Sequence, residues 1–301
     1  MDYIVQTRNV SKSFGREQAV IDLNMKIPKG EIYGFLGPNG AGKTTTIRML
    51  LGLMKPTSGS IHIFNKEIRT EKIEILKKVG SLVENPSYYP HLTAYENLEA
   101  LRIILGVPKS RIYDVLELVR LSDVANKKVQ GFSLGMKQRL GIAASLLHHP
   151  ELLILDEPTN GLDPSGIIEM RQLIKQLPRE FDMTVLISSH LLTEIDQIAT
   201  TVGIVSQGKM IFQDSIEAMR NHAKPKIALK VGNIAHAHRA LLSRGMKVEV
   251  QEEVIHLQEH SDEKIAQAIR FLVQDGISIY RVEEEKQSLE DIFLQMTTEG
   301  Q

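Results

Sequence analysis

Three short apolar runs predict strands of a parallel sheet that is buried on both faces. They are residues 32–36, 152–155 and 183–187. Continuous apolar strands are typical of parallel sheets covered by helices. The first run leads into a glycine-rich loop, and the other two end in polar residues, Asp156-Glu157 and Ser188-Ser189-His190. Because open α/β sheets bind ligands at the carboxyl ends of their strands, the pattern predicts one site formed by these ends.

Alternating and helical patterns predict the elements around this sheet. Residues 3–10 and 20–27 alternate apolar and polar side chains, which predicts two half-buried strands joined by a turn. Helical periodicity dominates from about 86 to 150, where Thr93 and Glu96 have the spacing of a capping box. We therefore expect an antiparallel β subdomain and a mostly helical insert beside the parallel sheet.

The character of the chain changes near residue 216. From there the pattern predicts a strand, a helix, two strands, a helix and a strand, which is the order of a small ferredoxin-like unit. A final helix is expected at 289–296, capped by Ser288. We expect two domains, residues 1–215 and an accessory α+β domain of residues 216–301 that holds no catalytic residue.

Composition narrows the class of protein. The 301 residues suffice for about two domains. A formal net charge of −1 provides no basic field, so nucleic acid is not an expected partner. The absence of cysteine excludes disulfides and thiolate metal sites. The start of the chain lacks the features of a signal peptide, and no apolar run approaches the ~18 residues that span a bilayer. We expect a cytoplasmic protein, or one that docks on a membrane through another subunit.

The glycine-rich loop after the first buried strand fits G-x-x-x-x-G-K-[ST] at every defining position. A strand, such a loop and a helix form a concavity of backbone N–H groups that holds a polyphosphate. Lys43 would reach the β- and γ-phosphates, and the Thr44 hydroxyl would ligate Mg²⁺. A chance glycine turn explains neither the full match nor both flanks, so we predict a site for a nucleoside triphosphate. Its expected residues are Gly37, Pro38, Asn39, Gly40, Ala41, Gly42, Lys43, Thr44 and Thr45.

Acidic and aromatic residues elsewhere extend this site. Asp156, at the end of an apolar strand, would hold Mg²⁺, and Glu157 would orient a water for attack on the γ-phosphate. The alternative is an ordinary surface acidic pair, which the preceding apolar run and Pro158 disfavour. Phe14, upstream of the phosphate loop, would either stack on the nucleotide base or fill the core, and its spacing does not decide between them.

With these motifs the chain resembles the ATP-binding cassette ATPases over residues 1 to about 215. Residues 160–163 resemble their D-loop, which ends in Asp163, and His190 resembles their switch histidine. The most diagnostic segment, 132–139, stands where the family carries its signature, Leu-Ser-Gly-Gly-Gln. The expected signature residues include Ser133 and Gly135, which are kept, and Leu134 and Met136, which replace the first glycine and the glutamine.

The resemblance implies a fold and an assembly. The fold is a P-loop NTPase cassette of the α/β class, with a parallel core sheet, an antiparallel β subdomain and a helical insert, followed by the ferredoxin-like domain. Ser133 opens a helix, and its hydroxyl with the unpaired N–H groups of that helix forms a second anion site. Two anion sites far apart in sequence suggest ATP held between two copies of the chain. Glu157 and His190 are the expected catalytic residues.

One departure from the family pattern is informative. Glu84 replaces the Q-loop glutamine, where it would accept from a Mg²⁺-bound water and connect the metal site to movement of a permease. This resembles the ATPases of bacitracin resistance and lantibiotic self-protection, with neutral drift as the alternative. The following loop, to Leu92, carries Tyr88 and Tyr89, which would either receive a permease helix or pack against the insert.

The expected function is that of an ATP-binding and hydrolysing subunit of an exporter. The resemblance implies separate permease subunits, a second copy of this chain, and a location on the inner face of the membrane. The cargo would be a peptide antibiotic, a lantibiotic or another amphiphile. A soluble ATPase that remodels ribosomal or nucleic-acid complexes is the alternative, although such proteins usually join two cassettes or insert a coiled coil. A binding module without turnover is a third, which Glu157 and His190 disfavour.

Overall fold

The computed structural model describes residues 2–83, 88–221, 226–251, 253–257, 261–285 and 292–293. Its elements divide into two compact units, one formed by Met1–Ile216 and the other by Glu217–Gln295. Each unit has its own sheets and its own buried cluster of apolar side chains, and each is described here by itself.

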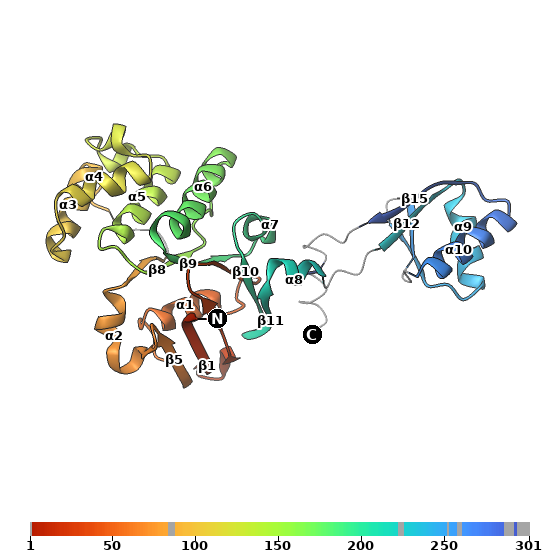
Figure 1. Cartoon of the computed structure of the whole chain (residues 1–301), viewed down its shortest axis with the longest axis horizontal. Coiled ribbons are helices and arrows are strands. Elements are labelled where there is room, and N and C mark those ends of the chain that lie inside the picture. Colours follow the sequence, from red (N-terminus) through yellow and green to blue (C-terminus); the bar gives the residue numbers. More distant parts are fainter. Residues whose placement is uncertain are drawn as a thin grey trace. The chain divides into compact units, whose positions relative to one another are not determined.

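A six-stranded sheet forms the centre of the first unit, in the order β11-β10-β4-β9-β8-β7 (Figure 1). Neighbouring strands are parallel except for the β10–β11 edge. Every residue of β4, β8 and β9 is buried, which confirms the prediction from the apolar runs. The strands are β4 (Ile32–Leu36), β7 (Val79–Leu82), β8 (Leu152–Asp156), β9 (Thr184–Ser189), β10 (Thr201–Ser206) and β11 (Lys209–Ser215).

An antiparallel sheet packs beside it, which confirms the expected β subdomain. Its order is β2-β1-β5-β6, and β3 pairs with β1. The strand predicted at 20–27 is in fact two strands, because the chain leaves β1 after residue 23 and pairs with a different part of it from residue 26. The strands are β1 (Tyr3–Phe14), β2 (Glu17–Leu23), β3 (Lys26–Pro28), β5 (Ser58–Ile63) and β6 (Lys66–Glu67).

One apolar cluster joins the two sheets to the helix that follows the phosphate loop, α1 (Lys43–Leu50). It contains Leu23 from the antiparallel sheet, Ile154 from the parallel sheet, and Ile47 from α1, all fully buried. Burial of such a side chain contributes about 1.5–3 kcal/mol. The helix that begins at the phosphate loop is therefore fixed from both sides.

Helices complete the first unit, and the helical insert is confirmed. Thr93 Oγ1 accepts from the Glu96 amide at 3.1 Å, and a Glu96 carboxylate oxygen accepts from the Thr93 amide at 2.7 Å, so the predicted capping box is present. The helices are α2 (Ile68–Leu76), α3 (Ala94–Leu105), α4 (Ser110–Leu118), α5 (Leu134–Leu146), α6 (Pro164–Phe181) and α7 (Leu192–Asp196), with 3₁₀ turns η1 (Ser122–Val124) and η2 (Val129–Gly131). A further helix, α8 (Ile216–Asn221), begins at Ile216, and its other residues belong to the second unit. Among the described residues, none of these helices is long and apolar enough to cross a bilayer.

The second unit is the predicted ferredoxin-like fold. Its strands form one antiparallel sheet in the order β13-β14-β12-β15. Apolar side chains of the strands and of both helices share one buried cluster, so the helices cover the same face of the sheet (Figure 1). The elements are β12 (Lys226–Val231), α9 (Ile234–Ser243), β13 (Val248–Gln251), β14 (Val254–Leu257), α10 (Asp262–Gln274) and β15 (Ile279–Glu285). The predicted helix at 289–296, with its cap Ser288, lies outside the described residues except for 292–293.

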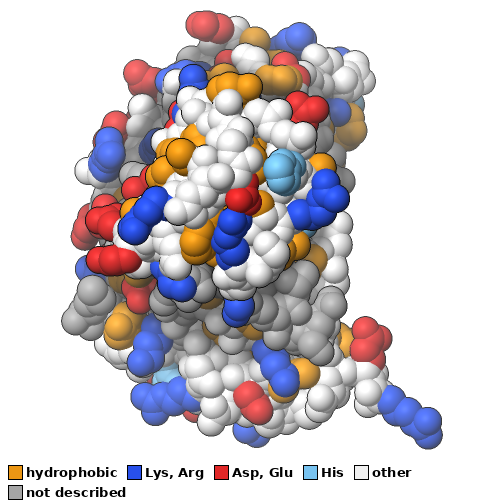
Figure 2. Space-filling model, turned by 90° about the vertical axis from the view of Figure 1, so that its right-hand side faces the viewer, with side chains coloured by type: hydrophobic (Ala, Val, Ile, Leu, Met, Phe, Trp, Pro, Cys, Tyr) orange, Lys and Arg blue, Asp and Glu red, His pale blue; other side chains and the backbone are white. Residues whose placement is uncertain are grey.

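The surface carries charges of both signs. In Figure 2, basic and acidic side chains are scattered over the visible face, with small groups of hydrophobic side chains between them. This distribution agrees with the formal net charge of −1.

Candidate functional site

The phosphate loop needs glycine at specific positions. Gly40 and Gly42 have φ angles of 81° and 98°, which side-chain-bearing residues rarely adopt. A Cβ atom on Gly37 would lie 2.4 Å from the carbonyl oxygen of Val205, and one on Gly42 would lie 2.4 Å from that of Ala19. Gly42 caps α1, so the loop delivers the unpaired N–H groups of a helix N-terminus to the site. The structure therefore builds an anion cradle where the motif predicts it.

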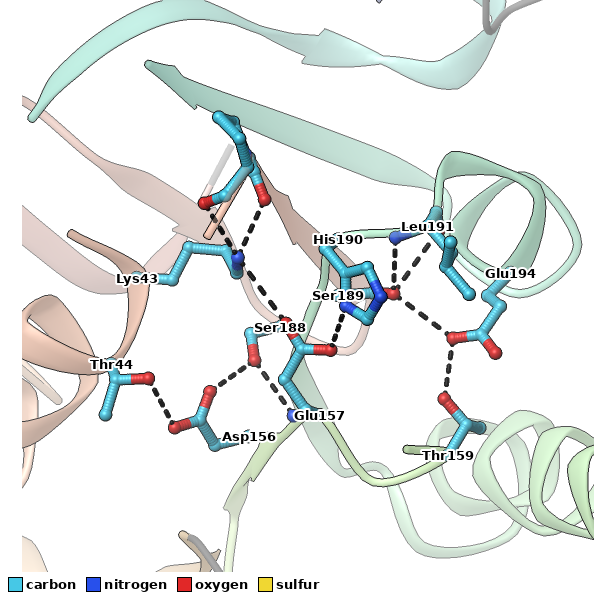
Figure 3. Close-up of polar contacts among 12 residues, drawn as sticks. Lys43, Thr44, Asp156, Glu157, Thr159, Ser188, Ser189, His190, Leu191 and Glu194 are labelled. Carbon is cyan, nitrogen blue, oxygen red and sulfur yellow. Dashed lines mark hydrogen bonds and ion pairs between the residues drawn. The ribbon is translucent and has the colours of Figure 1, made fainter. Parts of the chain in front are cut away.

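Lys43 lies inside this cradle. Its side chain is 6% exposed, and its ammonium group donates to the carbonyl oxygens of Gly37 at 2.7 Å and Pro38 at 3.3 Å. The same group lies 3.4 Å from Glu157 Oε1 (Figure 3). The Lys43 ammonium group, the only cation of the loop, thus contacts carbonyl and carboxylate oxygens. A bound phosphate would offer this group a stronger hydrogen-bond partner.

Thr44 and Asp156 supply oxygen ligands of the kind that Mg²⁺ prefers. The Thr44 hydroxyl donates to Asp156 Oδ2 at 2.9 Å, so the two predicted ligands from α1 and β8 meet. No cluster of three or more acidic, histidine or cysteine side chains that could hold a metal occurs among the described residues. Mg²⁺ is usually held by one or two protein oxygens together with substrate phosphates, which fits this pair. Glu84, the third predicted ligand, lies outside the described residues.

Ser188 fixes the acidic pair at the end of β8. Its hydroxyl donates to Asp156 Oδ1 at 2.5 Å and accepts from the backbone amide of Glu157 at 3.0 Å. Glu157 has a φ of 50° directly before Pro158, a conformation that costs about 1–3 kcal/mol for a residue of this kind. Sequence reasoning placed Ser188 at a strand end but assigned it no role, because its two partners lie on another strand.

The Glu157 carboxylate lies between two groups. One oxygen faces Lys43, and the other accepts from His190 Nδ1 at 2.7 Å (Figure 3). Glu157 is 22% exposed and His190 35% exposed, so solvent reaches both. The structure thus brings together the phosphate lysine and both predicted catalytic residues, which come from α1, the end of β8 and the end of β9.

The signature residues lie apart from this cluster. Ser133 caps α5, and its hydroxyl accepts from the Met136 amide at 3.2 Å, which confirms the predicted cap. Leu134 is 43% exposed and lies against Gly161 of the D-loop segment. In the part of the chain that the structure describes, no hydrogen bond or ion pair joins 133–136 to the phosphate loop. Asp163 is the exposed cap of α6 and accepts from the Gly166 amide at 3.1 Å.

Phe14, Tyr88 and Tyr89 differ in how far their rings are exposed to solvent. The Phe14 ring is 47% exposed, with the Lys12 ammonium 5.2 Å from its centroid, so it does not fill the core. The Tyr88 hydroxyl donates to the carbonyl oxygen of Lys137 at 2.5 Å, and burial raises the pKa of Tyr88. Tyr89 is 60% exposed. Of the two tyrosines, one packs on the signature helix and the other faces solvent.

An apolar groove lies beside these tyrosines. Its volume is about 660 Å³, and its walls come from β7, α3 and α5. Two of its residues, Leu53 and Ile104, are 66% and 80% exposed. The groove therefore presents large apolar side chains to solvent.

Comparison with known sequences identifies relatives, some of them over the full length of the chain. The model of the ABC transporter family matches residues 20–160. The bacitracin transport ATP-binding protein BcrA of Bacillus licheniformis is 43% identical over 100% of this chain and 99% of its own length. The lantibiotic transport ATP-binding protein SrtF of Streptococcus pyogenes is 44% identical over 72% of this chain and 93% of its own length.

Solved structures show the same fold over about 70% of the chain. An ATP-binding subunit of an ABC transporter has a TM-score of 0.65 and 26% identity, and the match covers 73% of this chain and 92% of that one. The cassette MJ0796, solved as a post-hydrolysis dimer with ADP and Pi, has a TM-score of 0.64 and 28% identity over 70% of this chain and 98% of its own. The full-length identity, the shared fold and the assembled phosphate site lead to one assignment. The chain belongs to the ABC transporter family and is an ATP-binding subunit with ATPase activity.

Proposed function

We propose that this ATPase powers export of a peptide antibiotic, or of a similar amphiphile, through separate permease subunits. The full-length likeness to a bacitracin transport protein and the likeness to a lantibiotic transport protein support the cargo class. The contact of Glu157 with both Lys43 and His190 carries the ATPase part of the proposal. The alternative of ribosome or nucleic-acid remodelling is not favoured by these relatives.

The geometry supports a role for each residue in hydrolysis. The loop amides and Lys43 bind the phosphates, and Phe14 offers an exposed ring for the base. Thr44 and Asp156 would hold Mg²⁺, which neutralises charge on the phosphates. Glu157 orients the attacking water, and the hydrogen bond from His190 Nδ1 fixes the orientation of the imidazole ring beside the γ-phosphate.

A second copy of the chain is proposed to complete the site. The hydroxyl of Ser133 and the start of α5 form an anion-binding helix N-terminus that does not contact the phosphate loop of its own chain. A solved relative is a dimer with ADP and Pi, which supports the same arrangement here. The signature residues Ser133 to Met136 would then contact ATP bound to the partner subunit, and Asp163 would lie near that interface.

The apolar groove is the proposed docking site for the permease. Helices commonly bind by laying an apolar face into such a groove. Exposed apolar side chains of α3 and the ring of Tyr89 line it, together with Val83, which precedes Glu84 in the sequence. Docking there would hold the ATPase on the inner face of the membrane. If Glu84 couples ATP hydrolysis to movement of the permease, Glu84→Ala should lower export more than it lowers hydrolysis by the isolated subunit. A proportional loss of both activities would contradict coupling.

The export proposal can be tested in bacteria that are sensitive to bacitracin and to a lantibiotic. The chain is expressed together with the membrane proteins encoded beside it, and the inhibitory concentration of each peptide is measured. We expect resistance to one of these peptides that disappears with Glu157→Gln. Unchanged sensitivity to both, with both components present in the membrane fraction and ATPase activity intact, would contradict the proposed cargo class.

A further inference from the structure

A second carboxylate near the site is buried and has no role in the proposed mechanism. Glu194 lies in the short helix α7 and is 5% exposed. Its Oε2 atom accepts hydrogen bonds from the Thr159 hydroxyl at 2.6 Å and from the Ser189 hydroxyl at 3.1 Å (Figure 3). One oxygen of one side chain thus joins two segments that are distant in sequence.

These two segments carry the proposed catalytic pair. Thr159 follows Glu157 by two residues, and Ser189 directly precedes His190. The Ser189 hydroxyl also accepts from the Leu191 amide at 3.0 Å, so it closes the turn on which His190 stands. The carboxylate therefore holds the chain next to each catalytic residue.

The position of this contact matters because the pairing between β8 and β9 ends there. The last backbone pair between β8 and β9 is Asp156 with Ser188. Beyond it, β8 and β9 form no further backbone pair with each other, although Ser189 still pairs with Leu36 of β4. Glu157 Oε2 and His190 Nδ1 must nevertheless stay 2.7 Å apart. The hydrogen bonds of Glu194 involve Thr159 and Ser189, which follow the last backbone pair between β8 and β9.

Burial of the carboxylate has a cost that an apolar residue would avoid. A carboxylate loses several kcal/mol of solvation when it is buried, and hydroxyl donors recover only part of that. A leucine of similar volume would pack α7 more cheaply. A role in holding geometry explains why a charged group occupies this position.

We propose that Glu194 is a positioning residue for ATP hydrolysis, which sets His190 relative to Glu157 by binding Thr159 and Ser189. This rests on the proposed catalytic roles of Glu157 and His190. Because the phosphate loop makes none of these contacts, loss of the carboxylate should affect kcat and leave ATP binding unchanged. Misplacement of a catalytic group by about 1 Å costs up to about 100-fold in rate.

The test compares purified full-length variants by steady-state ATPase kinetics. Glu194→Ala should lower kcat by about 10- to 100-fold with KM for ATP unchanged. Glu194→Gln retains an acceptor oxygen and should recover most of that loss. Thr159→Val and Ser189→Ala each remove one donor, so each should lower kcat, and each should have little further effect in the Glu194→Ala background. These two variants carry the test if Glu194→Ala does not fold.

A matched control separates positioning from stability. Thr7 is 4% exposed, and its hydroxyl also makes two hydrogen bonds, to the Leu23 carbonyl and from the Met25 amide. Thr7→Val should therefore lower the melting temperature without changing kcat per folded molecule. If Glu194→Ala and the two donor variants behave in the same way as this control, the positioning role is wrong.

Parallel variants of the catalytic pair show which assignment fails. Glu157→Gln and His190→Ala should both lower kcat. Normal turnover in both would overturn the catalytic pair and the positioning role with it. Slow turnover in both, with normal kcat in Glu194→Ala, Thr159→Val and Ser189→Ala, would overturn the positioning role alone.

Discussion

Replacement of Ser188 by alanine should damage stability and catalysis together. The side chain is fully buried, and the change removes its hydrogen bond to Asp156 and leaves the Glu157 amide without its hydroxyl acceptor. A hydrogen bond to a charged group contributes about 1.5–3 kcal/mol, and an unsatisfied buried donor costs about 1–3 kcal/mol. Local relaxation recovers part of this, so we expect unfolding free energy to fall by about 2–4 kcal/mol.

The catalytic effect follows from the strained backbone at Glu157. Ser188 helps to hold this residue at a φ of 50°, so its loss should let the carboxylate turn away from Lys43 and His190. We expect kcat to fall at least about tenfold, measured on folded protein at saturating ATP. Urea unfolding gives the stability change.

A control variant makes this prediction specific. Ser145 is also buried, but its hydroxyl donates only to the Ile142 carbonyl within α5. Ser145→Ala should cost about 1 kcal/mol and leave kcat unchanged. If Ser188→Ala were no worse than Ser145→Ala in either measurement, the reasoning about the acidic pair would be refuted.

Three further predictions concern binding, pH and domain structure. Lys43→Ala should weaken ATP binding by about 1.5–3 kcal/mol in an equilibrium titration, because the phosphates lose a charge-assisted contact, and unchanged affinity would show that another cation binds them. Burial lowers the pKa of His148 below 6.5, so the unfolded chain binds the proton more readily than the folded one. Stability should therefore be full above about pH 6.5 and fall as the pH drops below it, and His148→Gln should reduce that fall in urea midpoints. A chain that ends at Ser215 should keep ATP binding, and its loss in a demonstrably folded protein would show that the second unit completes the site.

The parts of the fold that the sequence predicts are those with local or periodic signals. The three buried strands were evident from continuous apolar runs, and the cap at Thr93 from the glutamate three residues later. The phosphate loop was evident from its full match to a motif, and the structure shows why the motif requires glycine there: positive φ angles and close backbone contacts.

Contacts made through space had no such signal. Ser188 forms hydrogen bonds with Glu157 and Asp156, which are 31 and 32 positions away in the sequence, and Thr159 with Glu194, which is 35 positions away. Nothing in a serine or threonine identifies a distant partner. The division of the strand at 20–27 depends on which part of β1 each half pairs with. The environment of Phe14 likewise required the packed structure.

The most direct test of the account is turnover by Glu157→Gln. The amide keeps the size of the side chain but loses the carboxylate that faces Lys43 and accepts from His190. We predict that this variant binds ATP normally, hydrolyses it about 100-fold or more slowly, and forms a dimer on a sizing column only with ATP. Near-normal hydrolysis by Glu157→Gln would contradict the central claim that this carboxylate orients the attacking water.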